Sequence, residues 1–379
     1  MRVAHVCLRY PPATGGVETY VHELATRSKA QGIDVRVLTS RLRTHGPTED
    51  LDADRLLDDK PYVQRLHHAE TPFISYPRLQ ALHYYLGHHQ PDVVHGHSFW
   101  YQPADVAARY AKRNKLPFVL SPYYYENEVR QKPLWQLYKT TIGRATFAAA
   151  DIVAVISPFE QKLIEQAGFP VKRFELLPPG VDVARFSQQH VNPFAARGMS
   201  GSVILTVSRL SKGKGLDDAI AALPAIRREV PDAQLVVVGE DFGALHDLKR
   251  QAGRLSIEQQ VHFLGKVSDE ELAGAYQHAD VFLHPTHYEA FGIVLAESLA
   301  AGTPVVARDV GAVSYVAPGG QTGLLFTDEE QLTKHIVTLL RDESRRSKLG
   351  RQGQRHVADN FTWGATIKKL TSLYEELRQ

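Results

Sequence analysis

The sequence of 379 residues contains a single cysteine, Cys7, and no long hydrophobic run. One cysteine excludes an internal disulfide framework and a cysteine-rich metal site. No stretch reaches the roughly 18 apolar residues of a membrane-spanning helix. The apolar stretch RVAHVCL near the N-terminus is too short for a signal peptide. We therefore expect a cytoplasmic protein, with peripheral attachment to a membrane surface left open.

Neither sign of charge dominates, since 44 Lys and Arg face 42 Asp and Glu. This balance gives no reason to expect non-specific binding along nucleic acid. An anionic ligand would therefore have to be held by a local site. The hydrophobic content of 43% is typical of a globular protein with sizeable cores, and the chain length favours two domains.

Two common phosphate-binding motifs are also missing. The turn after the first apolar run, TGGVETYV, lacks the GxGxxG pattern of dinucleotide-binding domains. In SRLSKGKGLDD, Gly215 stands where a P-loop requires Ser or Thr. These absences argue against a dehydrogenase and against a P-loop site.

Short apolar runs alternate with amphipathic stretches in two successive series. The strands expected in the first series are RVAHVCL, DVRVLTS, DVVHGH, PFVLS, DIVAVIS and FELLP. Those in the second are SVILTVS, QLVVVG, VHFLG, DVFLHP, PVVAR and GLLF. This alternation predicts two doubly wound α/β domains with parallel sheets, and the polar stretch 186–201 is interpreted as the linker between them.

In open α/β sheets, ligands collect outside the carboxyl ends of the strands. Gly15 and Gly16 follow the first strand, where a tight turn and free helical N–H groups could form an anion site. A plain strand-to-helix turn would explain them equally well. Arg209 and Lys214 lie between an expected strand and helix, and two cations at a helix N-terminus suit a diphosphate. The alternative is two solvated basic residues in a turn.

The stretch HYEAFGIVLAESLAAG places two glutamates in an apolar run. Glu289 is expected in a loop after the strand DVFLHP, and Glu297 about one and a half turns into the following helix. A buried carboxylate needs hydrogen-bond donors, and the two hydroxyls of a ribose would provide them. Alternatively, Glu297 lies on a narrow exposed stripe or pairs with a basic residue.

Two other clusters suggest metal binding more weakly. Asp50, Asp52 and Asp54 lie in DLDADRLLDD, which we interpret as a solvated loop because no flanking apolar strand fixes the side chains. His95 and His97 are two residues apart at the end of an expected strand, which could place one of them in a cleft between the two expected domains. Without a third ligand nearby, a structural or substrate-contact role is favoured over zinc.

Three spaced motifs now occur in order: Gly-Gly near the N-terminus, R-x4-KG from Arg209 to Gly215, and E-x7-E from Glu289 to Glu297. Together with two serial α/β domains, they resemble the retaining glycosyltransferases of family 4, the group 1 glycosyltransferases. The resemblance covers nearly the whole chain and is strongest in HYEAFGIVLAESLAAGTPVVA. It is specific for fold and reaction type, but not for substrate.

The resemblance implies the GT-B fold, in which two Rossmann-like domains face each other across a cleft. Residues 1–185 would bind the acceptor, and residues 200–359 would bind a nucleotide-sugar donor. The last segment, 360–379, would be a helix that crosses back to the first domain.

The resemblance also implies roles for individual residues. Arg209 and Lys214 would neutralise the diphosphate and Glu289 would contact the donor sugar, so these three are the catalytic candidates. Glu297 would hold the ribose hydroxyls. The other donor-site candidates are Gly16, Val267, Ala290, Phe291, Gly292 and Ile293, with the base near Lys266 and Val267. The acceptor or sugar-pocket candidates are Gly15, His97 and Tyr123.

No metal or cofactor is implied, because fixed cations can stabilise the leaving diphosphate, which also takes the acceptor's proton. The expected donor is a hexose-type sugar on UDP, with GDP-mannose next. The acceptor would be a small molecule, a glycan or a lipid-linked sugar, and no nucleic acid is expected as a partner. A nucleotide-sugar epimerase and a non-catalytic nucleotide-sugar-binding partner are the alternatives.

Two positions depart from the family pattern. Ser121-Pro122-Tyr123 stands where members often have Thr-Pro-His, and a phenol cannot carry the positive charge of a histidine. In the stretch 309–316, DVGAVSYV replaces a Gly-Gly followed by Pro-Glu. The first departure bears on activity or donor choice, and the second on the shape of one loop.

Overall fold

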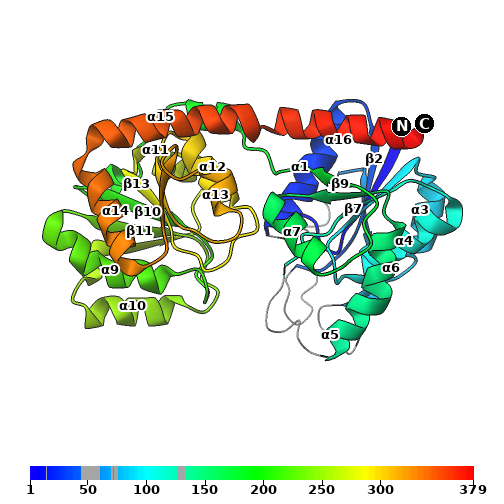
Figure 1. Ribbon diagram of the computed structural model, residues 1–379, viewed down its shortest axis with the longest axis horizontal. Helices are drawn as coiled ribbons and strands as arrows, with labels where there is room; N and C mark the ends of the chain where they lie inside the picture. Colours follow the sequence, from blue (N-terminus) through cyan, green and yellow to red (C-terminus); the bar gives the residue numbers. More distant parts are fainter. Residues whose placement is uncertain (14, 44–59, 70, 72–75, 126–132) are drawn as a thin grey trace. The chain divides into compact units, whose positions relative to one another are not determined.

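The computed structural model describes residues 1–379 except for 14, 44–59, 70, 72–75 and 126–132. The aspartates of the stretch 50–59 therefore lie outside the described residues. The chain divides into two compact units (Figure 1). Unit 1 contains Met1–Pro178 and Gly364–Gln379, and unit 2 contains Pro179–Trp363. No helix among the described residues is long and apolar enough to cross a bilayer.

Unit 1 is built on a seven-stranded sheet in the order β3-β2-β1-β6-β7-β8-β9, with all neighbours parallel. Its strands are β1 (Arg2–Val6), β2 (Asp34–Ser40), β3 (Val63–Leu66), β6 (Val93–His97), β7 (Phe118–Ser121), β8 (Ile152–Val155) and β9 (Phe174–Leu176). A small antiparallel pair consists of β4 (His68–Ala69) and β5 (Arg78–Leu79).

The helices of unit 1 connect these strands, except for the last, which returns from the far end of the chain. They are α1 (Gly16–Ala30), α3 (Leu82–His89), α4 (Gln102–Asn114), α5 (Pro133–Tyr138), η2 (Lys139–Gly143), α6 (Arg144–Ala149), α7 (Pro158–Gln166) and α16 (Trp363–Arg378). From Gly364 onward, α16 belongs to unit 1.

Unit 2 has a six-stranded parallel sheet in the order β12-β11-β10-β13-β14-β15. The strands are β10 (Val203–Val207), β11 (Gln234–Val238), β12 (Val261–Gly265), β13 (Val281–His284), β14 (Val305–Arg308) and β15 (Gly323–Phe326). The helices are α8 (Val183–Ser187), η3 (Ala195–Arg197), α9 (Leu216–Glu229), α10 (Leu245–Arg254), η4 (Glu258–Gln260), α11 (Asp269–His278), α12 (Ile293–Ala300), α13 (Val313–Val316), α14 (Glu329–Arg341) and α15 (Glu343–Asn360).

The two sheets confirm the α/β class that the apolar runs predict. Every residue of β6, β10 and β13 is buried, which is why these strands lack a polar alternate face. In both sheets the strand order reverses beside the first strand, between β1 and β6 in unit 1 and between β10 and β13 in unit 2. Such a reversal opens a crevice at the carboxyl edge of the sheet, where ligands of doubly wound folds bind.

The polar stretch 186–201 is not a free linker, contrary to the sequence-based interpretation. It belongs to unit 2, and its backbone packs on α11. The amide N–H of His190 donates to Oε1 of Gln277 over 3.0 Å, and a Cβ at Gly274 would collide with the carbonyl of Val191. The Pro and Gly content of the stretch therefore reflects an irregular but attached segment.

Candidate functional site

Two loops of unit 2 meet at the carboxyl edge of its sheet, one after β10 and one after β13. The amide N–H of His287 donates to the carbonyl of Gly213 over 3.0 Å, and the hydroxyl of Thr286 donates to the same carbonyl over 3.3 Å. Gly215 has a φ of +67° directly before α9, and a Cβ there would collide with the carbonyl of Pro285. Glycine is therefore required where the first loop crosses the second.

Arg209 and Lys214 lie in the first of these loops. Arg209 is exposed, and its guanidinium stands 5.2 Å from the ring centroid of Phe242. Lys214 precedes Gly215 and is half-buried. Among the residues that the structure describes, neither cation has an ion-pair partner. Two cations without an ion-pair partner, close before the start of α9, form a local anion site in a chain of balanced charge.

Glu289 lies in the second loop, as the sequence predicts. Its Oε2 is 3.0 Å from Nε2 of His284, the last residue of β13. Burial would raise the pKa of this carboxyl, but His284 and the charge of Lys214 outweigh it and hold the pKa below its ordinary value. Glu289 is therefore ionised, and it interacts electrostatically with Lys214 in the neighbouring loop.

The stretch 309–316, where the sequence departs from the family pattern, supports the backbone of Glu289. Its carbonyl accepts a hydrogen bond from the amide of Ala312 over 2.9 Å. Gly311 has a φ of +58°, and a Cβ there would collide with the same carbonyl. The loop thus retains a glycine at the point that supports Glu289.

Glu297 is the fifth residue of α12, which begins after Gly292 with a φ of +90°. Oε2 accepts a hydrogen bond from the hydroxyl of Tyr276 over 3.0 Å. Burial raises the pKa of Glu297 to about 7, although the bond from Tyr276 and the charge of Arg185 oppose the rise. Within the described part of the chain, Oε1 has no hydrogen-bond partner, so half of this carboxylate is available to a ligand.

The remaining donor-site candidates line the same edge or support it. Phe291 is 3% exposed and packs edge-on against Phe361, so its side chain belongs to the core. Ala290, Gly292 and Ile293 connect Glu289 to α12. Val267 is half-buried and lies two residues beyond the end of β12, and Lys266 is exposed.

Gly15 and Gly16 begin α1 at the carboxyl edge of the unit 1 sheet. A Cβ at Gly15 would collide with the carboxylate of Glu18, whereas Gly16 faces open space. Glu18 in turn accepts from Nε of Arg9 over 2.8 Å, with both side chains buried. Gly15 therefore leaves room for an internal ion pair, and Gly16 is the position that a ligand could approach.

His97 and Tyr123 lie together at the ends of β6 and β7. Nδ1 of His97 is 3.0 Å from the hydroxyl of Tyr123, and its Nε2 is 2.9 Å from Nδ1 of His5. His97 has no exposed surface, so it can support Tyr123 but does not itself reach a ligand in this conformation. Tyr123 adopts a φ of +47°, which is strained for a residue with a side chain.

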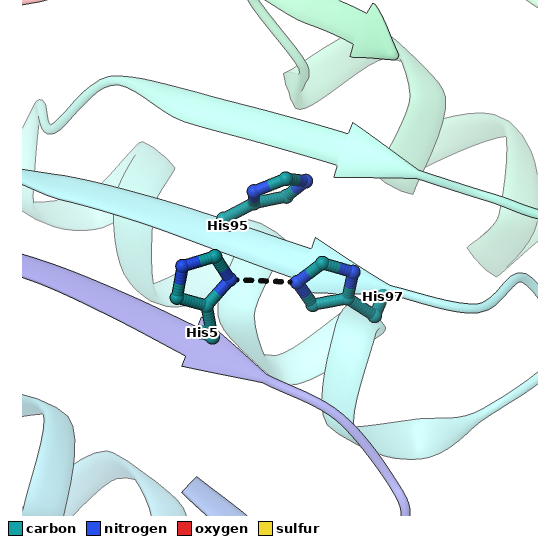
Figure 2. Close-up of side chains that lie close together, drawn as sticks. All are labelled: His5, His95 and His97. Carbon is teal, nitrogen blue, oxygen red and sulfur yellow. Dashed lines mark hydrogen bonds between the residues drawn. The ribbon is translucent and has the colours of Figure 1, made fainter. Parts of the chain in front are cut away.

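The third histidine near His95 and His97, which sequence reasoning missed, is His5 of β1 (Figure 2). The strand register pairs His5 with His95. The sequence signal for the cluster was therefore a histidine at matching positions of two expected parallel strands. Burial lowers the pKa of His5 to about 3 and holds those of His95 and His97 well below the usual 6.5. All three are therefore neutral at physiological pH.

These histidines form a hydrogen-bonded cluster. His95 contacts the hydroxyl of Tyr374 through Nδ1 at 2.6 Å and that of Ser121 through Nε2 at 2.9 Å. Among the described residues, Nε2 of His5 is the one ring nitrogen of the cluster that has no hydrogen-bond partner. Because the facing nitrogens of His5 and His97 already bind each other, the cluster is a set of core histidines in this conformation, with every ring nitrogen but Nε2 of His5 hydrogen-bonded.

Both parts of the chain match models of known protein families. Residues 14–185 match the model described as "Glycosyltransferase Family 4", and residues 194–356 match "Glycosyl transferases group 1". The chain is 30% identical to the D-inositol 3-phosphate glycosyltransferase of Kineococcus radiotolerans, over 96% of this chain and 91% of that protein. It is 27% identical to the glycogen synthase of Mycobacterium tuberculosis, over 99% of this chain and 94% of that protein.

Solved structures share the fold at lower identity. A structure of Anabaena Alr3699/HepE in complex with UDP matches with a TM-score of 0.82 and 19% identity, over 99% of this chain and 100% of that one. Sucrose-phosphate synthase from Thermosynechococcus elongatus matches with a TM-score of 0.79 and 22% identity, over 99% of this chain and 98% of that one. These matches confirm the GT-B fold.

Proposed function

Because this chain belongs to the family 4, group 1 glycosyltransferases, we propose that it is a retaining enzyme that transfers a hexose-type sugar from a nucleotide-diphosphate sugar to an acceptor hydroxyl. The observation that carries the proposal is the ionised Glu289 with the charge of Lys214 acting on it, together with Arg209, which lies in the same loop as Lys214. All three lie at the carboxyl edge of the unit 2 sheet, next to its point of strand reversal.

In the proposed reaction, Arg209 and Lys214 hold the diphosphate and oppose the negative charge that grows on it as the glycosidic bond breaks. Glu289 contacts the donor sugar, with its orientation fixed by His284 and its carbonyl held by Ala312. Glu297 accepts a hydrogen bond from the ribose through Oε1, while Tyr276 holds Oε2. The leaving phosphate takes the acceptor's proton, so neither a protein nucleophile nor a metal is required.

The donor that we favour is a UDP-sugar, with GDP-mannose next. The relatives of this chain include a GDP-mannose-dependent mannosyltransferase from Mycolicibacterium smegmatis, 29% identical over 98% of both chains, so both nucleotides deserve equal testing. The acceptor is a small molecule, a glycan or a lipid-linked sugar. The enzyme would act in the cytoplasm, at the inner membrane face where the acceptor carries a lipid.

The test is a thermal-shift panel of UDP- and GDP-sugars, followed by transfer or hydrolysis of the best binder with and without EDTA. We expect a rise in melting temperature with one nucleotide class and turnover that persists in EDTA. Complete loss of turnover that added metal restores would refute the metal-independent mechanism. Tight binding with no turnover toward any acceptor or water would favour a non-catalytic binding partner, the reading to which Tyr123 in place of histidine lends support.

A further inference from the structure

Unit 1 contains a cavity of about 310 Å³ between β5, α3 and α4. Four residues of α4 line it, namely Gln102, Val106, Arg109 and Arg113, whose spacings of four, three and four residues place them on one helix face. Arg78 from β5 and His83 from α3 complete the basic lining. The cavity therefore runs along the length of α4 and does not depend on the loops that carry the donor-site candidates.

The charges of the three arginines act on two neighbouring ionisable groups, Tyr76 and His83. Burial and Asp105 raise the pKa of the Tyr76 hydroxyl, whereas the charges of Arg109 and Arg78 lower it. Burial lowers the pKa of His83, and the charges of Arg113 and Arg109 lower it further. Arg78, Arg109 and Arg113 line one cavity, and Arg109 shares one ionisable neighbour with Arg78 and another with Arg113.

Within the described part of the chain, no carboxylate forms an ion pair with these arginines, although the charge of Arg109 counteracts the rise that burial causes in the pKa of Asp105. The guanidinium groups of Arg78, Arg109 and Arg113 have neither an ion pair nor a hydrogen bond there. The acid that acts on this region, Asp105, is 1% exposed. Its oxygens accept hydrogen bonds from Tyr76, Tyr138 and Thr146 and form no ion pair with the arginines of the lining.

Such an arrangement is unfavourable without a ligand. Like charges four residues apart on a helix repel each other, as Arg109 and Arg113 must. The chain has nearly as many acidic as basic residues, so the lack of ion pairs at these arginines does not reflect a shortage of carboxylates in the sequence. Guanidinium groups bind phosphate through paired N–H donors, which suits a cavity that presents several of them.

We propose that this cavity is a second binding site, for a small phosphorylated ligand that carries at least two anionic groups. Its volume lies at the lower end of the range for small-molecule pockets. Leu79, Leu82 and Val106 supply an apolar floor, and the Gln102 side chain is already bound to the amide of Leu79 over 3.1 Å. The arginines are therefore the groups that recognise the ligand.

Titration calorimetry of the full chain with inorganic pyrophosphate tests the proposal. The wild type should bind at two sites, one in unit 2 and one at the cavity. Arg109→Ala/Arg113→Ala should weaken one event by about tenfold or more per arginine and leave the other unchanged. Arg209→Ala/Lys214→Ala should do the reverse, so failure of the donor site and failure of the cavity site are distinguishable. Arg228→Ala, at an exposed arginine of α9, is the matched control and should change neither event.

A single binding event that disappears in Arg209→Ala/Lys214→Ala would overturn the proposal, as would a second event that Arg109→Ala/Arg113→Ala leaves intact. The source of the phosphate is settled by phosphatidylcholine vesicles with and without phosphatidic acid. Vesicle binding that is lost in Arg109→Ala/Arg113→Ala assigns the site to a lipid headgroup. If only pyrophosphate binding changes, the ligand is a free phosphate ester. Equal melting temperatures of the variants confirm that folding is unaffected.

Discussion

The hydroxyl of Tyr374 lies 2.6 Å from Nδ1 of His95, although 279 positions separate the two residues in the chain. His95 is in a central strand of unit 1, and Tyr374 is in its last helix, α16. Both side chains are fully buried. The same helix contributes a partly exposed ion pair, between Lys369 and Glu175 at 2.8 Å.

Tyr374→Phe should lower the free energy of unfolding of unit 1 by about 1–3 kcal/mol, because it leaves a buried nitrogen of His95 without its partner. Urea unfolding measures the change. Lys369→Ala is the control, since the lysine of this ion pair is exposed and its removal should cost less than about 1 kcal/mol. Equal losses in the two variants would show that the Tyr374 hydroxyl contributes nothing specific.

Acidification below about pH 6.5 should destabilise the protein through the histidine cluster. The folded-state pKa of His5, about 3, is depressed from 6.5 by burial. The unfolded chain therefore takes up protons that the folded chain does not, so this stability is complete above pH 6.5 and is lost as the pH falls toward 3. His5→Asn, which keeps an N–H donor but cannot titrate, should flatten the slope of unfolding free energy by up to about 1.4 kcal/mol per pH unit.

The control for this experiment is His246→Asn, because the His246 side chain is 87% exposed. Its curve should remain parallel to that of the wild type. Burial raises the pKa values of Glu160 and Glu297 to about 7, which makes the folded state gain stability as the pH falls from 7 toward 4.5. The difference between His5→Asn and wild type cancels this opposing effect, and parallel curves for those two would contradict the prediction.

Arg209→Ala and Lys214→Ala should each reduce the transfer rate by about 10²- to 10³-fold, because each removes a fixed charge from the leaving diphosphate. Steady-state kinetics with the best donor gives kcat and KM. Melting temperatures should stay near wild type, since neither cation has an ion-pair partner among the described residues. Lys212→Ala, an exposed lysine of the same loop, should retain full activity. Normal turnover in either of the first two variants would refute the diphosphate role.

Glu297→Gln should weaken nucleotide binding by about tenfold or more, because a neutral amide is a poorer acceptor for ribose hydroxyls than a carboxylate. The carboxyl has a pKa of about 7, so nucleotide affinity of the wild type should fall as the pH falls through that value. Calorimetry at about pH 8 and about pH 6 should show this fall in the wild type and not in Glu297→Gln. A pH-independent affinity in the wild type would separate Glu297 from the ribose.

Much of unit 2 was predictable because its signals are local. The apolar runs predicted the strands of its sheet. The loops after β10 and β13 contain Arg209, Lys214 and Glu289, as the sequence predicts. The position of Glu297 inside α12 also followed from helical spacing. Its partner Tyr276 did not, because that contact joins two helices whose packing no single stretch of sequence encodes.

The histidine cluster was missed for the same physical reason. His95 and His97 were seen as a pair, but His5 joins them only through pairing of β1 with β6, and Tyr374 only through the return of α16. The prediction that 186–201 is a linker was wrong because amino-acid composition shows that a segment is polar but not whether it packs on its domain. Its backbone is hydrogen-bonded to α11. Contacts between distant segments are thus the part that periodicity does not reveal.

Unit 1 is discontinuous, since its sheet is complete by Leu176 while the helix that covers His95 begins only at Trp363. During translation, the whole of unit 2 is synthesised before Tyr374 is added to the chain. Until then Nδ1 of His95 lacks its hydrogen-bond partner, so the core of unit 1 cannot be completed before the chain of unit 2 has been made.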